Sequence, residues 1–144
     1  MKSDIRFMLK LIASVVLNKE APEVAADVNW ENILKIASIH NVANIVAYGI
    51  AKGGYNVPLQ IKGQFDLKLY ERMTVSDNQN AEIDKIFKAF EENEIQYMPF
   101  KGIILQKLYP SDDMRFMADA DVLIKNNLLK LKNYDNIKYS RYSN

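Results

Sequence analysis

The segment 95-IQYMPFKGIILQKLYPSDDMRFMADADVLI-124 decides the fold, because its hydrophobic pattern changes twice within thirty residues. Residues 95–100 form a short bounded run rich in β-forming side chains, which predicts a strand. Residues 102–109 have a helical pattern that Pro110 ends. Residues 118–124 are apolar apart from two aspartates and predict a second strand. We therefore expect a strand–helix–strand unit.

The chain before this segment predicts helices, because its apolar residues recur at helical spacing. The helices are expected at residues 3–18, 30–40, 42–51 and 59–92. Asn29 is a suitable N-cap for the second helix, and Gly53-Gly54 ends the third. The fourth helix is expected to break near Thr74–Asp77. A further strand is expected at residues 137–142. The predicted fold class is α+β, with a helical region at 1–78 and an α/β unit containing a small mixed sheet at 79–144.

Asp119 and Asp121 are unusual in a run that predicts a buried strand. Residues i and i+2 of a strand face the same side, so the two carboxylates would lie about 6.6 Å apart along it. Burial and mutual repulsion both disfavour two such charges. A hard divalent cation such as Mg²⁺ would neutralise them and keep positions open for phosphate. The alternative is that both are solvated residues at the start of the strand.

Lys101-Gly102 lies where the first strand turns into the helix. Backbone N–H groups at a helix start favour an anion, glycine permits close approach, and the lysine adds a positive charge. The alternative is that the glycine only permits a tight turn and that the lysine is an ordinary surface residue. Arg115, four residues before Asp119, is a candidate for binding a carboxylate or a phosphate, or is simply a loop arginine.

These residues together resemble the signature of a family of uncharacterised bacterial nucleotidyltransferases. The family pattern is lysine-glycine, a short helix ending in leucine-x-x-x-tyrosine-proline, an arginine, and aspartate-hydrophobic-aspartate with an aliphatic tail. The matching residues are Lys101, Gly102, Leu105, Tyr109, Pro110, Arg115, Asp119, Asp121, Leu123 and Ile124. The stretch 30-WENILKIASIHNV-42 is also similar to the family's N-terminal region.

The resemblance implies membership of the DNA polymerase beta-like nucleotidyltransferase superfamily and a partial nucleotidyltransferase-type α/β unit. The implied activity is transfer of a nucleoside monophosphate from a triphosphate such as ATP to an acceptor, with Mg²⁺ or Mn²⁺. Asp119 and Asp121 would be the catalytic metal ligands. Gly102 and Lys101 would lie near the triphosphate, with Arg115 as a further candidate for nucleotide contact.

The sequence departs from the superfamily pattern in two respects. The usual glycine-serine pair at the strand–helix turn is replaced by Lys101-Gly102-Ile103, which has no hydroxyl. The third carboxylate normally comes from a later strand, and Asp135 is the only acidic residue after Asp121. The missing third carboxylate predicts a truncated catalytic domain, with weak or lost activity in this short chain.

Composition excludes several classes of protein. The chain has 144 residues and no cysteine, so it has neither disulfides nor thiolate chemistry, which suits the cytoplasm. A net charge of +1 does not indicate a nucleic-acid partner. The apolar run at residues 11–17 is much shorter than the roughly 20 residues of a membrane span.

Two other functions remain open from the sequence. Glycosyltransferases also use Asp-x-Asp to hold a metal and a nucleotide-sugar, but a full α/β half would precede that motif, and here helices do. The third interpretation is a non-catalytic helical interaction module, or a fragment that pairs with another chain. An exposed sheet edge would then favour a homo-oligomer.

Overall fold

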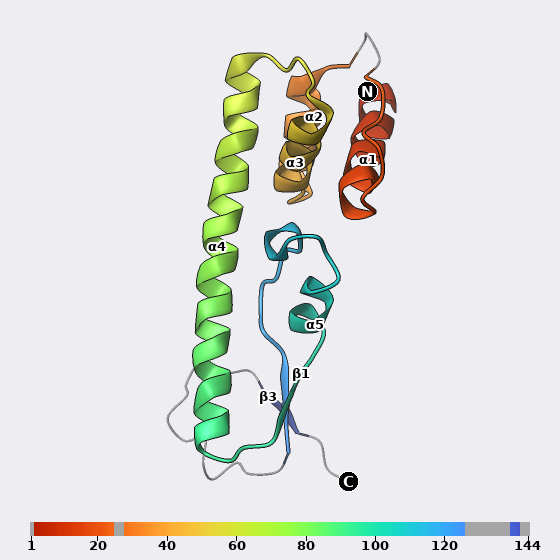
Figure 1. The fold of residues 1–144 in the computed structure, drawn as a ribbon. Helices are drawn as coiled ribbons and strands as arrows, with labels where there is room; N and C mark the ends of the chain where they lie inside the picture. The colour runs from red at the N-terminus through yellow and green to blue at the C-terminus, as the bar shows by residue number, and fades with distance from the viewer. Residues whose placement is uncertain (1, 25–27, 126–138, 142–144) are drawn as a thin grey trace. The chain divides into compact units, whose positions relative to one another are not determined.

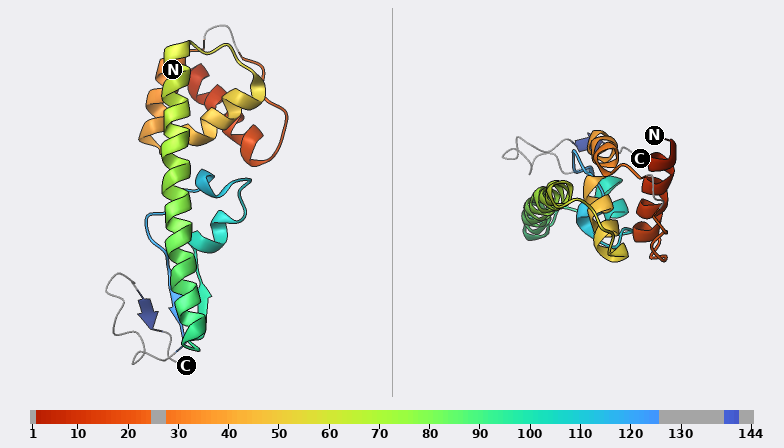
Figure 2. Two further views of the ribbon diagram at one scale, coloured as in Figure 1. Left: turned by 60° about the vertical axis from the view of Figure 1, so that its left-hand side comes forward. Right: turned by 90° about the horizontal axis from the view of Figure 1, so that it is seen from above.

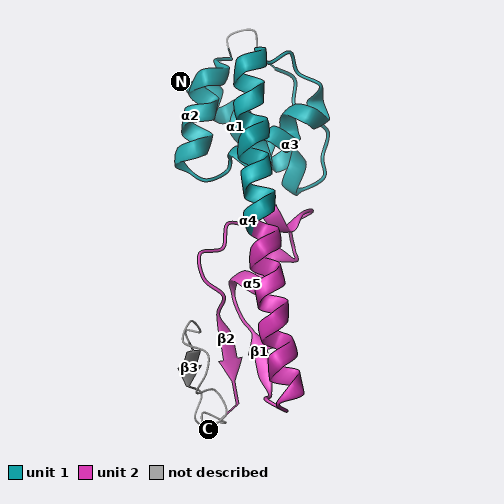
Figure 3. Cartoon of the chain, turned by 90° about the vertical axis from the view of Figure 1, so that its left-hand side faces the viewer, with its two compact units in different colours: residues 1–75 teal, residues 76–144 magenta. Residues whose placement is uncertain are grey.

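The computed structural model describes residues 2–24, 28–125 and 139–141. Two compact units divide the chain, residues 1–75 and residues 76–144 (Figure 3). Helix α4, Leu59–Glu92, contributes its first part to unit 1 and its second part to unit 2. The division into functional regions 1–78 and 79–144 stays a prediction.

Unit 1 consists of helices, as the sequence predicts. Helices α1, α2 and α3 precede the first part of α4 in the chain (Figures 1 and 2). Their bounds are Lys2–Val16, Trp30–Ile39 and Ala43–Gly53. The side chains at the centre of the core are almost completely removed from water, and this burial provides most of the stabilisation. They are Leu11, Ile33, Ala37, Val46 and Phe65.

Helix α2 begins, and helix α3 ends, at the capping residues that the sequence predicts. Asn29 caps α2, and its Oδ1 accepts a hydrogen bond from the Asn32 N–H at 3.0 Å. Gly54 follows α3 with a φ of +60°, a left-handed conformation that glycine adopts without a steric penalty. Both predicted caps are confirmed.

A buried carboxylate joins α1 to the start of α2. Asp4 is 2% exposed. It accepts hydrogen bonds from the Asn29 N–H at 3.1 Å and from Asn32 Nδ2 at 2.6 Å. The backbone hydrogen bond from Asn29 and the side-chain hydrogen bond from Asn32 hold the pKa of Asp4 below its usual 3.8. The charged form of Asp4 therefore stabilises this junction.

Helix α4 is continuous from Leu59 to Glu92, so the break predicted near Thr74–Asp77 is wrong. The polar residues there are accommodated inside the helix. Thr74 Oγ1 donates a hydrogen bond to the Tyr70 carbonyl at 3.0 Å. Ser76 is 1% exposed and accepts a hydrogen bond from another element of unit 2. The segment after Gly63 contains no glycine or proline that would end the helix.

Unit 2 has a three-stranded sheet in the order β1-β2-β3. The strands are β1 Tyr97–Pro99, β2 Val122–Ile124 and β3 Tyr139–Arg141. Strand β2 pairs antiparallel with β1 and parallel with β3, which makes the sheet mixed. The α+β class with a helical N-terminal region and a small mixed sheet is confirmed, and β3 lies within the strand predicted at residues 137–142.

The core of unit 2 forms between the second part of α4 and the antiparallel pair of strands β1 and β2. Tyr97 of β1 stacks on Phe87 of α4, with ring centroids 4.6 Å apart. Its hydroxyl donates to Glu91 at 3.1 Å, and burial, together with the charge of Glu91, raises the pKa of Tyr97. The buried apolar side chains are Ile83, Phe90, Ile95, Ile103, Met117, Val122 and Ile124. This core holds both strands that flank the predicted site.

Candidate functional site

The antiparallel β1–β2 ladder brings the two halves of the predicted site to the same end of the sheet. Within it, Tyr97 pairs with Ile124 and Pro99 with Val122. Beyond the strands, the Phe100 N–H donates to the Asp121 carbonyl at 3.0 Å. Asp121 is therefore opposite Phe100, directly before the turn into α5, which spans Gly102–Gln106.

The strand that carries the aspartates is shorter than predicted. It begins at Val122 rather than at residue 118, so Asp119 and Asp121 precede it. The register explains the difference, because continuing it would place Ala120 opposite Lys101, where the chain leaves β1 and turns into α5. Asp119 is exposed, and the side chain of Asp121 is 33% exposed. The expectation that both carboxylates are buried in a strand is wrong, and their electrostatic penalty is correspondingly smaller.

The structure brings Lys101 and Gly102 to the aspartates. Lys101 Nζ lies 3.2 Å from Asp121 Oδ2, which makes an ion pair. A Cβ atom added to Gly102 would lie 3.0 Å from Met117 Sδ and 3.7 Å from the Asp119 carbonyl oxygen. Glycine therefore lets the turn pack closely against the segment that leads to β2. Lys101, Gly102, Asp121 and the backbone of Asp119 thus lie at one place in unit 2.

The backbone of the turn is unusual at Lys101. This residue has φ 45° and ψ −107°, a region that glycine adopts far more readily than residues with a Cβ. Gly102 is not among the residues with positive φ. The lysine therefore occupies the position that favours glycine on backbone grounds, whereas the glycine beside it is favoured by close packing.

Helix α5 ends at Gln106, three residues before the predicted end. A helix of five residues has a small dipole, so the expected anion site at its N-terminus is weaker than the sequence indicates. Any attraction for phosphate at this turn depends more on the charge of Lys101 and on close approach at Gly102.

Arg115 follows the short 3₁₀-helix η1, Asp112–Met114. Its backbone N–H donates to the Asp112 carbonyl at 3.4 Å, and its side chain is partly buried. The contacts that assemble the turn involve Lys101, Gly102, Asp119 and Asp121. A role for Arg115 in nucleotide binding stays a prediction.

Polar side chains that the sequence did not single out hold α5 and η1 in place. Gln106 is 1% exposed, and its Nε2 donates to Ser76 Oγ at 3.3 Å and to the Asp112 carbonyl at 3.0 Å. Asp112 Oδ2 accepts from Asn80 Nδ2 at 2.9 Å and pairs with Lys107 Nζ at 2.5 Å. Gln79 Nε2 donates to the Met117 carbonyl at 2.9 Å.

The signal for this network lies at the predicted break in α4 and directly after it, where polar side chains recur. Ser76, Gln79 and Asn80 have the i, i+3, i+4 spacing that places side chains on one face of a helix. That face hydrogen-bonds to α5 and to the segment from η1 to Met117. The network positions the segment carrying the aspartates relative to the turn at Gly102.

The donor chemistry of the turn fits a hard divalent cation. The charge of Lys101 already rests against Asp121, so this carboxylate holds a positive group in the folded chain. The carboxylates of Asp119 and Asp121 are both reachable from solvent. Mg²⁺ commonly binds through one or two carboxylates, with water and substrate phosphates completing its shell.

Across residues 2–24, 28–125 and 139–141, no three His, Cys, Asp or Glu side chains gather into a metal-binding group. Asp135, the only sequence counterpart of the third carboxylate, lies outside the described residues. The fit of the cation to this chain therefore rests on the two aspartates alone.

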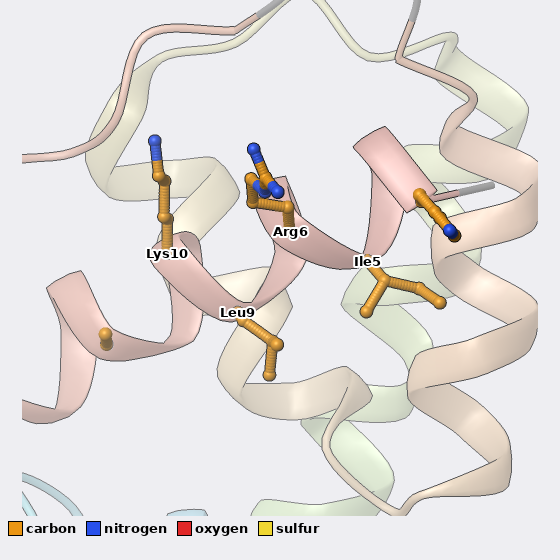
Figure 4. Close-up of a pocket in the computed structure, with 6 residues that line it drawn as sticks. Ile5, Arg6, Leu9 and Lys10 are labelled. Atoms are coloured by element: carbon orange, nitrogen blue, oxygen red, sulfur yellow. The ribbon is translucent and has the colours of Figure 1, made fainter.

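A second surface feature lies on the outer face of α1 in unit 1 (Figure 4). This open groove is lined by Lys2, Ile5, Arg6, Leu9, Lys10 and Ala13. It has no carboxylate, hydroxyl or imidazole, and it contains none of the predicted site residues. It is therefore a poorer candidate for catalysis than the turn in unit 2. In the part of the chain that the structure describes, no helix combines the length and apolar character needed to cross a membrane.

Comparison with known families identifies the family of the chain. Residues 26–134 match the model of a family described as uncharacterised nucleotidyltransferase. Because the match covers well over half of the 144 residues, the chain belongs to this family. Neither the curated proteins nor the solved structures give a match. The wider kinship with the polymerase beta-like superfamily and the expected truncation stay predictions.

Proposed function

We propose that this protein binds a nucleoside triphosphate such as ATP together with Mg²⁺, or Mn²⁺, and transfers the nucleoside monophosphate to an acceptor. The observation that carries the proposal is the meeting of the Lys101-Gly102 turn with Asp119 and Asp121 in a chain of the nucleotidyltransferase family. The glycosyltransferase alternative has no comparable support.

Each residue has a defined part in this proposal. Asp119 and Asp121 would hold the cation through their carboxylate oxygens. When bound, the metal would supply activation of the acceptor hydroxyl and neutralise charge on the phosphates. Lys101 would donate hydrogen bonds to a phosphate oxygen, and Gly102 would let the backbone approach the triphosphate. Arg115 is a further candidate for a phosphate contact. The proposal places the protein in the cytoplasm and includes kinship with the polymerase beta-like superfamily.

Calorimetric titration with MgATP tests this proposal. The double substitution Asp119→Asn/Asp121→Asn should abolish the binding heat, because it removes both charges that hold the cation. Asp77→Asn/Asp84→Asn is the matched control, since it removes the same charge from exposed positions in unit 2. The control should bind like the wild type. Equal heats from the wild type and the Asp119/Asp121 variant would refute the site.

A second candidate function is a non-catalytic interaction module. It is favoured by large apolar side chains of unit 2 that are 40% to 74% exposed. They are Met98, Phe100, Ile104, Leu105, Leu108 and Phe116. A monomer that exposes this many apolar side chains in a small unit is a candidate for partner binding.

Pairing of β1 edges would be a poor route to a homo-oligomer. Phe100 donates its N–H to β2, so in the alternating ladder Pro99 faces the outer edge, where it has no N–H to donate. Contact between the exposed apolar side chains of two copies is therefore the better candidate for a homo-oligomer interface. Light scattering should give a dimer that Ile104→Asp/Leu108→Asp dissociates, whereas a wild-type monomer would argue against self-association.

A further inference from the structure

Lys101 has a feature that the proposed function does not by itself explain. Its ammonium group is 3.2 Å from Asp121 Oδ2, so it lies against one of the two carboxylates assigned to the metal. A lysine and a divalent cation cannot both occupy the same carboxylate oxygen without strong repulsion. Each therefore weakens the binding of the other at Asp121.

We infer that Lys101 competes with the metal ion for the Asp121 carboxylate and moves to the nucleotide when metal and triphosphate bind. This inference rests on the proposed function and concerns the regulation of the same site. Binding of the metal alone is then opposed by Lys101. Binding of the metal with a triphosphate is favoured, because the phosphates give the released ammonium group a new partner. Because such coupling is reciprocal, each ligand promotes binding of the other.

The exposure of the pair makes this exchange feasible. The Lys101 side chain is 63% exposed and that of Asp121 is 33% exposed. Ion pairs this open to water are weak, so the pair contributes little to stability and opens easily. The ammonium group also carries three donors on a flexible four-carbon stem, which lets it change partners without moving the backbone.

The backbone at Lys101 supports a role for the side chain in binding rather than in folding. Its φ of 45° and ψ of −107° make glycine the residue with the least strain at this position. A lysine there lowers stability relative to glycine, yet its side chain reaches the carboxylate. Lys101→Gly is therefore a variant that removes the charge and also relieves the strain.

Lys107 gives a closely matched control. It also pairs with an aspartate in unit 2, and Lys107 Nζ is 2.5 Å from Asp112 Oδ2. The exposed fractions of its pair are 64% and 33%, close to those of Lys101 and Asp121. Lys107→Met therefore removes an equivalent charge from a similarly exposed ion pair outside the proposed metal site.

The test measures the affinity of the full chain for Mn²⁺ alone and, separately, its affinity for ATP in the presence of EDTA. Lys101→Met should bind Mn²⁺ about threefold more tightly than the wild type, since the exposed ion pair that competes with the metal is weak. The same variant should bind metal-free ATP several-fold more weakly, because it loses a phosphate donor. Lys101→Arg should retain both wild-type affinities to within a few-fold, and Lys107→Met should change neither.

Lys101→Gly separates this inference from a structural role. It should melt at the wild-type temperature or above, and still show tighter Mn²⁺ binding and weaker ATP binding. A Lys101→Met variant with unchanged or weaker Mn²⁺ affinity would overturn the inference while leaving the proposed function intact, provided that the wild type binds MgATP. Absence of both Mn²⁺ and ATP binding in the wild type would overturn both.

Discussion

The two units of the chain are stabilised in different ways. Unit 1 consists of helices of ten residues or more around fully buried side chains such as Leu11, Ile33 and Phe65. In unit 2, strands β1 and β2 have three residues each and α5 has five. Elements this short are not stable by themselves. They are held by the core against α4 and by side-chain hydrogen bonds, notably those of Gln106. The candidate site lies at the ends of β1, α5 and β2, which depend on these contacts for their stability.

The largest expected effects come from removing a buried aromatic ring from each core. Phe65 in unit 1 is 0% exposed and Phe90 in unit 2 is 1% exposed. Phe65→Ala and Phe90→Ala should each reduce the free energy of unfolding by roughly 3–5 kcal/mol. Hydrogen exchange should show the loss of protection mainly in the unit that carries the substitution. An equal loss across both units would contradict their separation.

Asp4→Asn tests the polar junction of unit 1. The substitution should lower the free energy of unfolding by about 1.5–3 kcal/mol at neutral pH, because hydrogen bonds to a charged group contribute about this much. Folding lowers the pKa of Asp4 below 3.8. The stabilisation by the charged carboxylate is therefore complete above pH 3.8, and it is lost as the pH falls through the lower pKa of the folded state. Denaturation between pH 6 and pH 2 should show the stabilities of the wild type and variant converging at low pH. A constant difference would rule out the charged hydrogen bonds.

Gln106→Leu tests whether side-chain hydrogen bonds hold unit 2. The substitution keeps much of the buried volume but removes the donors to Ser76 and Asp112, and it should cost about 1–3 kcal/mol. MgATP binding should weaken as well, because α5 and η1 lose a common anchor. Gln96→Leu is the control, since Gln96 is exposed, and it should change stability by no more than about 0.5 kcal/mol. Unchanged stability in Gln106→Leu would show that the network is dispensable.

Much of the fold follows from local signals in the sequence. Helix spacing, the Asn29 cap and the glycine after α3 are properties of a few neighbouring residues, and each predicted its element correctly. The meeting of Lys101-Gly102 with the aspartates was also predictable, since a strand–helix–strand segment returns the chain to the same sheet. The aliphatic residues after Asp121 correctly indicated β2.

The remaining features depend on contacts that sequence patterns do not contain. The run of polar residues in α4 looked like a break, because the partner of Ser76 lies thirty residues away in α5. Strand β2 is short because its partner turns away at Lys101, and only the register between the strands reveals this. The ion pair between Lys101 and Asp121 depends on the same register.

Paramagnetic broadening by Mn²⁺ in amide NMR spectra tests the central claim most directly. With ATP present, the amides of residues 101–103 and 119–122 should broaden first, whereas those of α1 and α2 should stay sharp. Asp119→Asn/Asp121→Asn should remove this pattern. Broadening centred on any other segment, or the same pattern in the double variant, would contradict a metal site formed by these two aspartates.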